Sequence, residues 1–418
     1  MGLNKRLYFG WYIVFSASII TLLTMGMRLG IGPFVTPVME DLNISRTDFS
    51  IIIAVGMIVY GLGMPLAGYL ANKYSTRLMM LIGLSIVCLS IGWTVLSKGT
   101  LSFLLSYGVL LSLGLALLSN IALSPIVSKW FLHQKGKALF FLSTGGMAGI
   151  AVITPLETWL ISAVGWKVTL IILGGVFVSI VLPAAMFIMK ENVPAGADGR
   201  GKQIVQPDRT LKNISFMDAV KTRAYFQIVF GLFACGFGMN LLGSHGVPML
   251  IDHGFNPMTA SFGVGMIGFV AIFSTVLLGQ FADRYPRKNL LFLIYFIRGL
   301  GFFGLVLAAT NWQLYLVAFE GGLVWAGNIA MSTAILSDLF GVRLLGLLNG
   351  WAFFIGHQVG AAIGSFLGGY AYEIFGTHVI SFGLAAILAI LASLAAVTLP
   401  TNIDFDSEFA DGKLKEAK

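Results

Sequence analysis

The sequence predicts an all-α membrane protein with twelve transmembrane helices, arranged as two six-helix bundles. Three observations predict this fold class. Of the 418 residues, 57% are hydrophobic and only 11% are charged, whereas soluble chains carry roughly 25% charged residues. The mean hydropathy is +0.89. The chain also contains 51 glycines, and glycine is more frequent in membrane helices than in soluble ones. This composition excludes a soluble enzyme, a nucleic-acid-binding protein and a disordered chain.

The net charge of +8 does not change this conclusion, because the basic residues recur in short polar breaks between apolar runs. That distribution is expected from the positive-inside rule. The two cysteines, Cys88 and Cys235, both fall inside apolar runs. We therefore expect neither a disulfide nor a metal site. The chain contains no nucleotide-binding motif, and we expect no cofactor.

A membrane-crossing helix needs about 20 predominantly apolar residues, and twelve such runs follow one another. They span 11–33, 49–71, 77–96, 100–128, 137–162, 166–189, 223–251, 258–282, 288–309, 312–339, 342–372 and 376–399. The first run is too long for the apolar region of a signal peptide, so we interpret it as the first span.

The longest polar stretch, 190–222, separates the sixth span from the seventh. Its composition is typical of a soluble linker, with a short amphipathic helix expected near 213–222. We therefore predict an N-terminal six-helix bundle at 1–190, a cytoplasmic linker at 191–222, a C-terminal six-helix bundle at 223–400 and a cytoplasmic tail at 401–418.

Lysine and arginine set the predicted orientation. When both termini are placed inside, most basic residues fall in inside segments, and the outside loops contain only Arg46, Lys98 and Lys167. This asymmetry predicts cytoplasmic termini. We expect a multi-pass protein of the bacterial plasma (inner) membrane.

The two halves contain matching loop motifs. Gly68-Tyr-Leu-Ala-Asn72-Lys73 follows the second span, and Gly279-Gln-Phe-Ala-Asp283-Arg284 follows the eighth, at an offset of 211 residues. The motif resembles the loop signature of the major facilitator superfamily, whose members consist of two parallel six-span repeats. The resemblance implies a secondary transporter that works by alternating access. It also implies that spans 1, 4, 7 and 10 line a central cavity.

An acid and a base in such a loop can form bonds that exist in only one conformation. We predict a conformational latch at Asp283 and Arg284, with a weaker copy at Asn72 and Lys73, where asparagine replaces the usual aspartate. For Lys73, the alternative is a simple positive-inside anchor.

Three shorter and less specific motifs indicate a group within the superfamily. Tyr8–Trp11, Trp130–Phe131 and Ser244–Pro248 resemble the bacterial monocarboxylate transporter and oxalate/formate antiporter group. That group often carries an arginine in the eighth span, four residues before the loop-motif glycine, where this chain has Thr275. The resemblance implies a small organic anion as the substrate.

Arg28 is the principal candidate for binding this anion. It lies deep in the first span, and Gly30, Gly32 and Pro33, which follow it, can interrupt the helix. A charge at the bilayer centre costs roughly 2.5–3.5 kcal/mol even on insertion scales, so it needs a partner, water or a function. The guanidinium binds carboxylates bidentately, which predicts a substrate clamp. The alternative is a structural ion pair or a side chain that snorkels.

Other side chains in the spans are candidate substrate contacts. The predicted substrate-binding set is Arg28, Asn120, His245, Trp325, Asn328 and His357. The asparagines and histidines can donate to a carboxylate, and Trp325 can form an apolar wall. For each polar member, the alternative is a hydrogen bond that joins two helices.

Two groups are candidates for carrying a coupled proton. Glu320 lies in the tenth span and His245 in the seventh, and histidine titrates near neutral pH. Glu320 also lies at a depth similar to that of Arg298 in the ninth span, which favours a structural ion pair between them. Glu157, near the outer end of the fifth span, is expected to be interfacial.

Glycines four residues apart predict close helix packing. They occur at Gly145 and Gly149 on span 5 and at Gly360, Gly364 and Gly368 on span 11. We expect them to form surfaces across which the two halves slide.

Together these observations predict a transporter for a small, monocarboxylate-like organic anion, operating by proton symport or by antiport of one anion for another. The expected partners are the organic acid, protons and the lipid bilayer, without nucleic acid, and the expected oligomeric state is a monomer. Two alternatives remain open: efflux of lipophilic compounds or drugs, and a non-transporting membrane sensor with a transporter fold.

Overall fold

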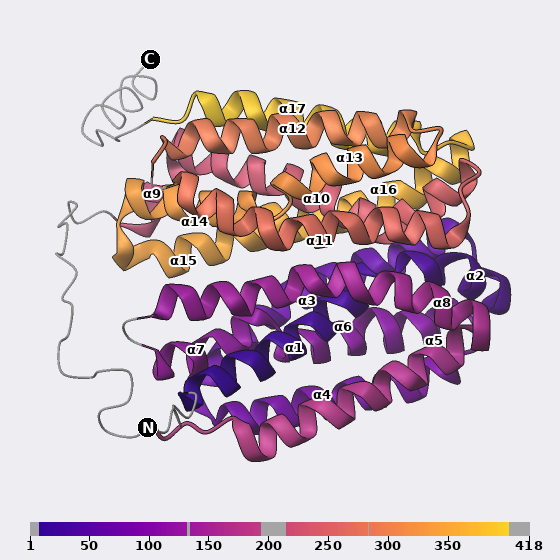
Figure 1. Ribbon diagram of the computed structural model, residues 1–418, viewed down its shortest axis with the longest axis horizontal. Coiled ribbons are helices and arrows are strands. Elements are labelled where there is room, and N and C mark those ends of the chain that lie inside the picture. The colour runs from indigo at the N-terminus through magenta and orange to yellow at the C-terminus, as the bar shows by residue number, and fades with distance from the viewer. Residues whose placement is uncertain (1–7, 132–133, 194–214, 283, 401–418) are drawn as a thin grey trace, which may run out of the picture.

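The computed structural model describes residues 8–131, 134–193, 215–282 and 284–400, and every regular element in these ranges is a helix. The predicted all-α fold class is confirmed. Two halves lie side by side, the first formed by α1 to α8 and the second by α9 to α17 (Figure 1).

The first half contains helices of very different lengths. They are α1 (Phe9–Leu29), η1 (Gly32–Phe34), α2 (Val35–Leu42), α3 (Arg46–Lys73), α4 (Thr76–Val95), α5 (Thr100–Phe103), η2 (Leu104–Leu111), α6 (Ser112–Leu117), α7 (Asn120–Trp130), α8 (Lys135–Pro183) and η3 (Ala184–Ile188).

The second half begins with the short helix α9 (Phe216–Lys221), which confirms the predicted helix near 213–222. The others are α10 (Arg223–Asp252), α11 (Pro257–Ala282), α12 (Arg287–Leu307), α13 (Asn311–Val324), α14 (Gly327–Phe340), α15 (Val342–Ala352), η5 (Phe353–Gln358), α16 (Val359–Phe375) and α17 (Val379–Val397).

Ten helical segments of the described chain are long and apolar enough to cross a membrane. One of them, α8, is divided at Gly165, where φ is 79° and ψ is 165°, a conformation that favours glycine. The continuous segment α15–η5–α16 is a further apolar helix. These helices are consistent with the twelve predicted spans.

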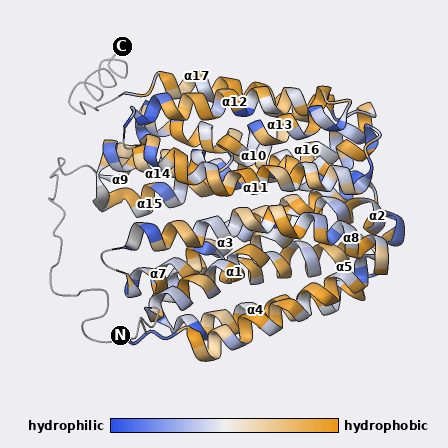
Figure 2. Ribbon diagram, viewed as in Figure 1, coloured by the Kyte–Doolittle hydropathy of each residue, from blue (hydrophilic) through white to orange (hydrophobic). Residues whose placement is uncertain are grey.

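The surface of the molecule suits a bilayer. Large apolar side chains such as Phe15, Leu101, Phe187 and Leu307 are more than half exposed. Hydrophobic residues line the helices along their length, and hydrophilic residues gather toward the two ends of the molecule (Figure 2). Such a continuous apolar surface is stable against lipid and unstable in water.

The glycine contacts show that the two halves repeat one helix packing. A Cβ built on Gly145 would lie 2.3 Å from the carbonyl oxygen of Ser18, and one on Gly149 would lie 2.4 Å from that of Leu22. The same contacts recur 211 residues later. A Cβ built on Gly356 would lie 2.6 Å from the carbonyl oxygen of Val229, and one on Gly360 would lie 2.3 Å from that of Phe233.

These contacts join α1 to α8 in the first half, and α10 to η5 and α16 in the second. Our expectation that the two halves slide across these glycines is therefore wrong. The backbones approach so closely that there is no room for a Cβ, which locks helices within each half.

The fourth and tenth spans are both interrupted near the middle of the membrane. In the fourth, α6 ends at Leu117 and α7 begins at Asn120; in the tenth, α13 ends at Val324 and α14 begins at Gly327. Side chains of neighbouring helices satisfy carbonyls that the interruptions free. Thr24 Oγ1 donates to the Leu118 oxygen at 3.3 Å, and Arg298 Nη2 donates to the Trp325 oxygen at 2.6 Å. Irregular backbone inside a membrane protein needs such partners.

The two halves meet mainly toward one end of the molecule, which we call the distal end. It carries the turns at Asn43, Gly254 and Gly376 and lies opposite the ends at which α1 begins and α17 finishes (Figure 1). Here Gly265 and Gly268 of α11 approach the backbone of α8, and Gly369 of α16 approaches Ser50 of α3. The hydrogen bonds between described residues of the two halves also lie in the distal part or near the middle.

The repeated glycine packing can be tested with Gly360→Ala. The new Cβ would lie against the Phe233 backbone, which cannot move aside, so we expect a loss of about 1–3 kcal/mol in stability. The measurement is the thermal unfolding midpoint of the detergent-purified protein.

Gly92→Ala is the matched control, because nothing lies within 4 Å of a Cβ at Gly92 of α4. Its midpoint should stay unchanged or rise slightly, since alanine favours the helix by about 0.5–1 kcal/mol. Equal destabilisation by the two substitutions would contradict the packing argument.

Candidate substrate-binding site

Arg28 lies at the junction of the two halves, near the distal end of α1. Its residue surface is only 8% exposed. Nη2 donates to the Gln358 side-chain oxygen at 3.1 Å and to that of Asn240 at 3.4 Å, so the guanidinium bonds two helices of the opposite half. Its carbon lies 4.1 Å from the centre of the Tyr60 ring, a cation–π contact.

No carboxylate pairs with this charge. The ion pairs among described residues do not include Arg28, and the remaining guanidinium contacts are the sulfurs of Met25 and Met57. The Nε atom has no hydrogen-bond partner. A buried charge that meets only neutral acceptors is poorly compensated, so the group retains the capacity to bind an anion.

Little free space surrounds the guanidinium. The cavity lined by Arg28, Tyr60, Tyr107 and Ser112 has a volume of only ≈ 20 Å³, about enough for a single water. The structure is therefore closed around Arg28, and a substrate needs the halves to separate.

The predicted substrate-binding residues lie in four separate places. His357 is 2% exposed and stacks on Phe353. Its Nδ1 lies 3.3 Å from the side-chain oxygen of Gln358, which also accepts the hydrogen bond from Arg28 Nη2. It therefore belongs to the group that we call the Arg28 cluster, which consists of Arg28, Tyr60, Asn240, His357 and Gln358. Asn120 is bonded instead to Ser143 at 3.2 Å, within the first half.

Trp325 and Asn328 lie together in the second half, at the interruption of the tenth span. Asn328 is fully buried, and neither atom of its side-chain amide has a partner. Trp325 is also buried, and its indole N–H is unpartnered. Unsatisfied buried polar atoms are rare in folded proteins, and here they mark a polar region in the membrane interior.

The predicted ion pair between Arg298 and Glu320 is not formed in this structure. Arg298 is 3% exposed and donates to the Cys235 sulfur at 3.0 Å and to the Trp325 carbonyl, with its guanidinium 4.8 Å from the Trp325 ring. Glu320 is only partly buried and forms no ion pair with a described residue. Arg298 therefore stabilises the interrupted tenth span, which sequence spacing could not indicate.

The predicted latch falls largely outside the described residues. Asp283 and the side chain of Asn72 are not described. Arg284 is exposed, and Lys73 Nζ contacts the Tyr69 hydroxyl at 3.2 Å in its own helix. The latch stays a prediction.

A different set of bonds holds the distal end closed. Arg46 of α3 forms an ion pair with Asp252 of α10 at 2.8 Å, and His378 Nε2 lies 2.9 Å from the same carboxylate. The Arg46 guanidinium also lies 3.9 Å from the Tyr372 ring centre. We call Arg46, Asp252 and His378 the distal cluster.

His245, predicted to bind substrate or carry a proton, lies beside this cluster rather than beside Arg28. It is fully buried, and its Nε2 lies 3.1 Å from Ser50 Oγ of the first half and 3.0 Å from the Ser365 carbonyl. Its ring centre is 6.5 Å from that of His378. This position joins the two halves at the closed end.

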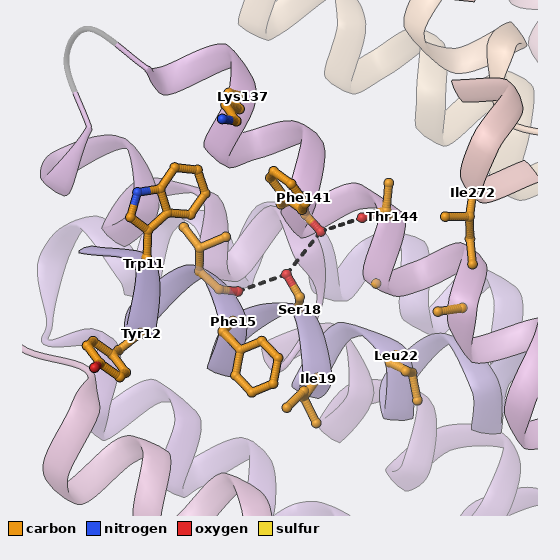
Figure 3. A pocket seen from close by; sticks show the side chains of 13 residues that line it. Trp11, Tyr12, Phe15, Ser18, Ile19, Leu22, Lys137, Phe141, Thr144 and Ile272 are labelled. Atoms are coloured by element: carbon orange, nitrogen blue, oxygen red, sulfur yellow. Dashed lines mark hydrogen bonds between the residues drawn. The ribbon is translucent and has the colours of Figure 1, made fainter. Parts of the chain in front are cut away.

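A much larger cavity, with a volume of ≈ 680 Å³, lies elsewhere. It opens between α1, the first part of α8 and Ile272 of α11, and nearly all its lining is apolar, including Trp11, Phe15 and Phe141 (Figure 3). Arg28 does not line it. A groove of this composition suits an acyl chain or another lipophilic molecule better than a small anion.

Three residues around Arg28 were not predicted from the sequence: Tyr60, Asn240 and Gln358. Each is a polar residue inside an apolar run, and that signal was present in the sequence. Nothing in their spacing, however, indicated that spans 2, 7 and 11 converge on Arg28.

Comparison with known proteins decides the family. The profile of the Major Facilitator Superfamily matches residues 15–357 and, in an overlapping match, 228–415. The chain belongs to this superfamily. It is accordingly a multi-pass membrane protein and a transporter rather than an enzyme.

Several relatives are transporters. The uncharacterized MFS-type transporter YcxA of Bacillus subtilis (strain 168) is 28% identical over 407 residues, covering 93% of each chain. Monocarboxylate transporter 13 of Rattus norvegicus is 22% identical and covers 94% of this chain and 89% of its own. Monocarboxylate transporter 4 of Mus musculus is 25% identical, covering 63% of this chain and 56% of its own.

Solved structures support the fold. The nucleoside transporter NupG superposes with a TM-score of 0.72 at 14% identity, covering 93% of this chain and 99% of its own. A bacterial homologue of the human lysosomal transporter Spinster, in an inward-facing and occupied conformation, gives a TM-score of 0.69 at 13% identity, covering 92% and 96%. At these identities the likeness establishes the superfamily fold alone.

The distal cluster predicts a pH dependence. Burial lowers the pKa of His378, which outweighs the opposing effect of its bond to Asp252, and Arg46 lowers the pKa further. Because the folded value lies below the ordinary value of about 6.5, the closed structure favours the neutral ring. Its contribution to stability is complete above about pH 6.5 and is lost as the pH falls.

We therefore expect His378→Gln to lose less of its thermal midpoint than the wild type between about pH 7.5 and about pH 5.5. Glutamine can still donate to Asp252 but does not titrate. His253→Gln, at the neighbouring exposed histidine, is the control and should behave like the wild type. An unchanged pH response in His378→Gln would show that this ring does not titrate against the closed form.

Proposed function

We propose that this transporter moves a small, monocarboxylate-like organic anion by alternating access. The two bundles, 1–190 and 223–400, would rock about a site at Arg28. The observation that carries the proposal is the buried Arg28 guanidinium, which contacts side chains of both halves but pairs with no acid among the described residues. A carboxylate substrate would supply the missing counter-charge with bidentate geometry.

The surroundings of Arg28 support a small anion with an apolar body. The guanidinium lies among neutral donors and acceptors, namely Asn240, Gln358 and Tyr60, together with the apolar Met57. The resemblance to several monocarboxylate transporters agrees with this chemistry. His357 is the nearest of the other predicted binding residues, through its contact with Gln358.

The proposed energy source is a proton or anion gradient, through symport or antiport. Among the predicted proton carriers, His245 lies at the distal interface and Glu320 on a partly buried face of α13. We also propose that the protein acts as a monomer in the bacterial inner membrane, with both termini cytoplasmic. In that orientation, the distal end faces the outside of the cell. The structure would then be closed toward the outside.

The apolar groove between α1 and α8 favours one second candidate, the efflux of lipophilic compounds. Its volume of ≈ 680 Å³ and nearly all-apolar lining suit such a substrate. Efflux through the groove would not need Arg28. Substitution of Arg28 should therefore abolish transport of the organic anion but leave efflux of lipophilic compounds unchanged.

The test is uptake of labelled lactate and pyruvate into proteoliposomes by wild type, Arg28→Lys and Arg28→Gln. Lysine keeps the charge but loses the bidentate fork. We expect Arg28→Gln to reduce uptake roughly 30-fold or more, because one partner of a buried charge pair is removed, and Arg28→Lys to be impaired less severely.

Arg287→Lys is the matched control, since Arg287 is paired with Asp338 at a half-exposed site far from α1 along the chain; it should transport normally. Wild-type uptake of both acids that is unaffected by Arg28→Gln would refute the clamp. Transport of lipophilic dyes without acid uptake would favour efflux.

A further inference from the structure

The buried carboxyl group of Glu157 is the least explained polar group in the molecule. Glu157 lies in α8 and is only 1% exposed, although the sequence analysis expected it at the membrane interface. Its Oε2 has no hydrogen-bond partner, and no ion pair of the described residues includes it. An ionised carboxylate in such a position is strongly destabilised unless it holds a proton or gains a partner.

Glu157 lies next to the region that ends α1. A Cβ built on Gly30 would lie 2.4 Å from Glu157 Oε2 and 3.2 Å from Thr154 Oγ1. Only a glycine leaves room for the carboxyl group there. Gly30 is two residues beyond Arg28 and ends α1, so the acid and the arginine flank the same helix end.

Tyr107 lies near both groups. Tyr107 lines the small cavity that contains Arg28, and its phenol lies within electrostatic range of the Glu157 carboxyl. Arg28 and Glu157 are nevertheless not paired in this structure. The guanidinium points instead to Asn240 and Gln358 across the interface.

Few other titratable groups lie on the elements packed against α8. Tyr12 and Arg28 are on α1, Arg77 and Cys88 on α4, and Lys129 on α7, while η1, η3 and α11 carry none. On α2, Asp41 pairs with Lys167 at the surface and Glu40 is exposed. Among the described residues, Glu157 is the only aspartate or glutamate that is buried.

We propose that Glu157 carries the coupled proton by competing with the substrate for Arg28. The inference rests on the proposed transport of an organic anion. Without a proton, the Glu157 carboxylate attracts the guanidinium. When the carboxylate takes up one proton, it becomes neutral, and Arg28 is released to bind the carboxylate of the substrate.

One proton and one monovalent anion then move together, so the loaded carrier gains no net charge. Binding is ordered, because protonation must precede the substrate. This structure, with the distal end closed and Glu157 unpartnered, corresponds to the protonated form. His245 and Glu320 are not needed for this step.

The first test compares wild type, Glu157→Gln and Glu320→Gln in proteoliposomes. Glutamine has nearly the shape of the protonated carboxyl group but cannot release a proton. We expect Glu157→Gln to lose lactate accumulation driven by a pH gradient about tenfold or more. Exchange of lactate at equal pH on both sides should stay within about twofold of wild type. Loss of gradient-driven accumulation in Glu320→Gln, with Glu157→Gln at the wild-type level, would assign the proton to Glu320 and overturn the inference.

Gradient-driven accumulation by Glu157→Gln at the wild-type level would overturn the inference and leave the proposed function intact. Loss of exchange together with accumulation, in a protein with a normal thermal midpoint, would also overturn it, because a neutral mimic should still exchange. Absence of lactate and pyruvate transport in the wild type would refute the proposed function instead.

The second test does not depend on transport. Infrared spectroscopy of the reconstituted protein should show the carbonyl stretch of a protonated carboxylic acid in the wild type and in Glu320→Gln. This band should be missing in Glu157→Gln. If Glu157→Gln keeps the whole band, the buried carboxyl group does not hold the proton, and the inference fails.

Discussion

The unpaired guanidinium of Arg28 is the constraint on which the candidate site depends. A charge buried between two halves of a membrane protein needs compensation, and here it meets neutral amides, a tyrosine face and methionine sulfurs. Those contacts come from both halves, so separating the halves removes part of the solvation of Arg28. A bound anionic solute can replace the polar contacts that the Arg28 guanidinium loses. The same interaction therefore links binding to the movement of the bundles.

That movement requires each half to be rigid. The glycine contacts between α1 and α8, and between α10 and α16, recur at an offset of 211 residues and leave no space for a methyl group. Between the halves, glycines also approach backbone, at Gly265 and Gly268 of α11 and at Gly369 of α16, but polar side-chain bonds accompany them. The ion pair of Arg46 with Asp252 and the contact of Ser50 with His245 are polar and lie toward the distal end. Polar contacts can exchange with water when that end opens, whereas the close backbone packing within each half cannot.

The interruptions of the fourth and tenth spans place polar backbone in the membrane interior. Thr24 and Arg298 satisfy the freed carbonyls, and the unpartnered Asn328 follows the second interruption. Arg298 and Arg28 thus have different tasks, although both are buried arginines in apolar spans. Arg298 donates to a backbone carbonyl of its own half, whereas Arg28 donates to side-chain amides of the opposite half.

The sequence by itself determined the fold class, the spans and the repeat, because membrane length, apolar composition and the offset of the loop motifs are local properties of the chain. It also identified Arg28, since a deep charge is conspicuous in an apolar run. The partners of that charge, the fate of Arg298 and the burial of Glu157 were decided by the tertiary structure alone. A polar residue within a span shows its depth in the sequence but not the direction it faces, and the direction depends on how helices distant in the chain pack around it.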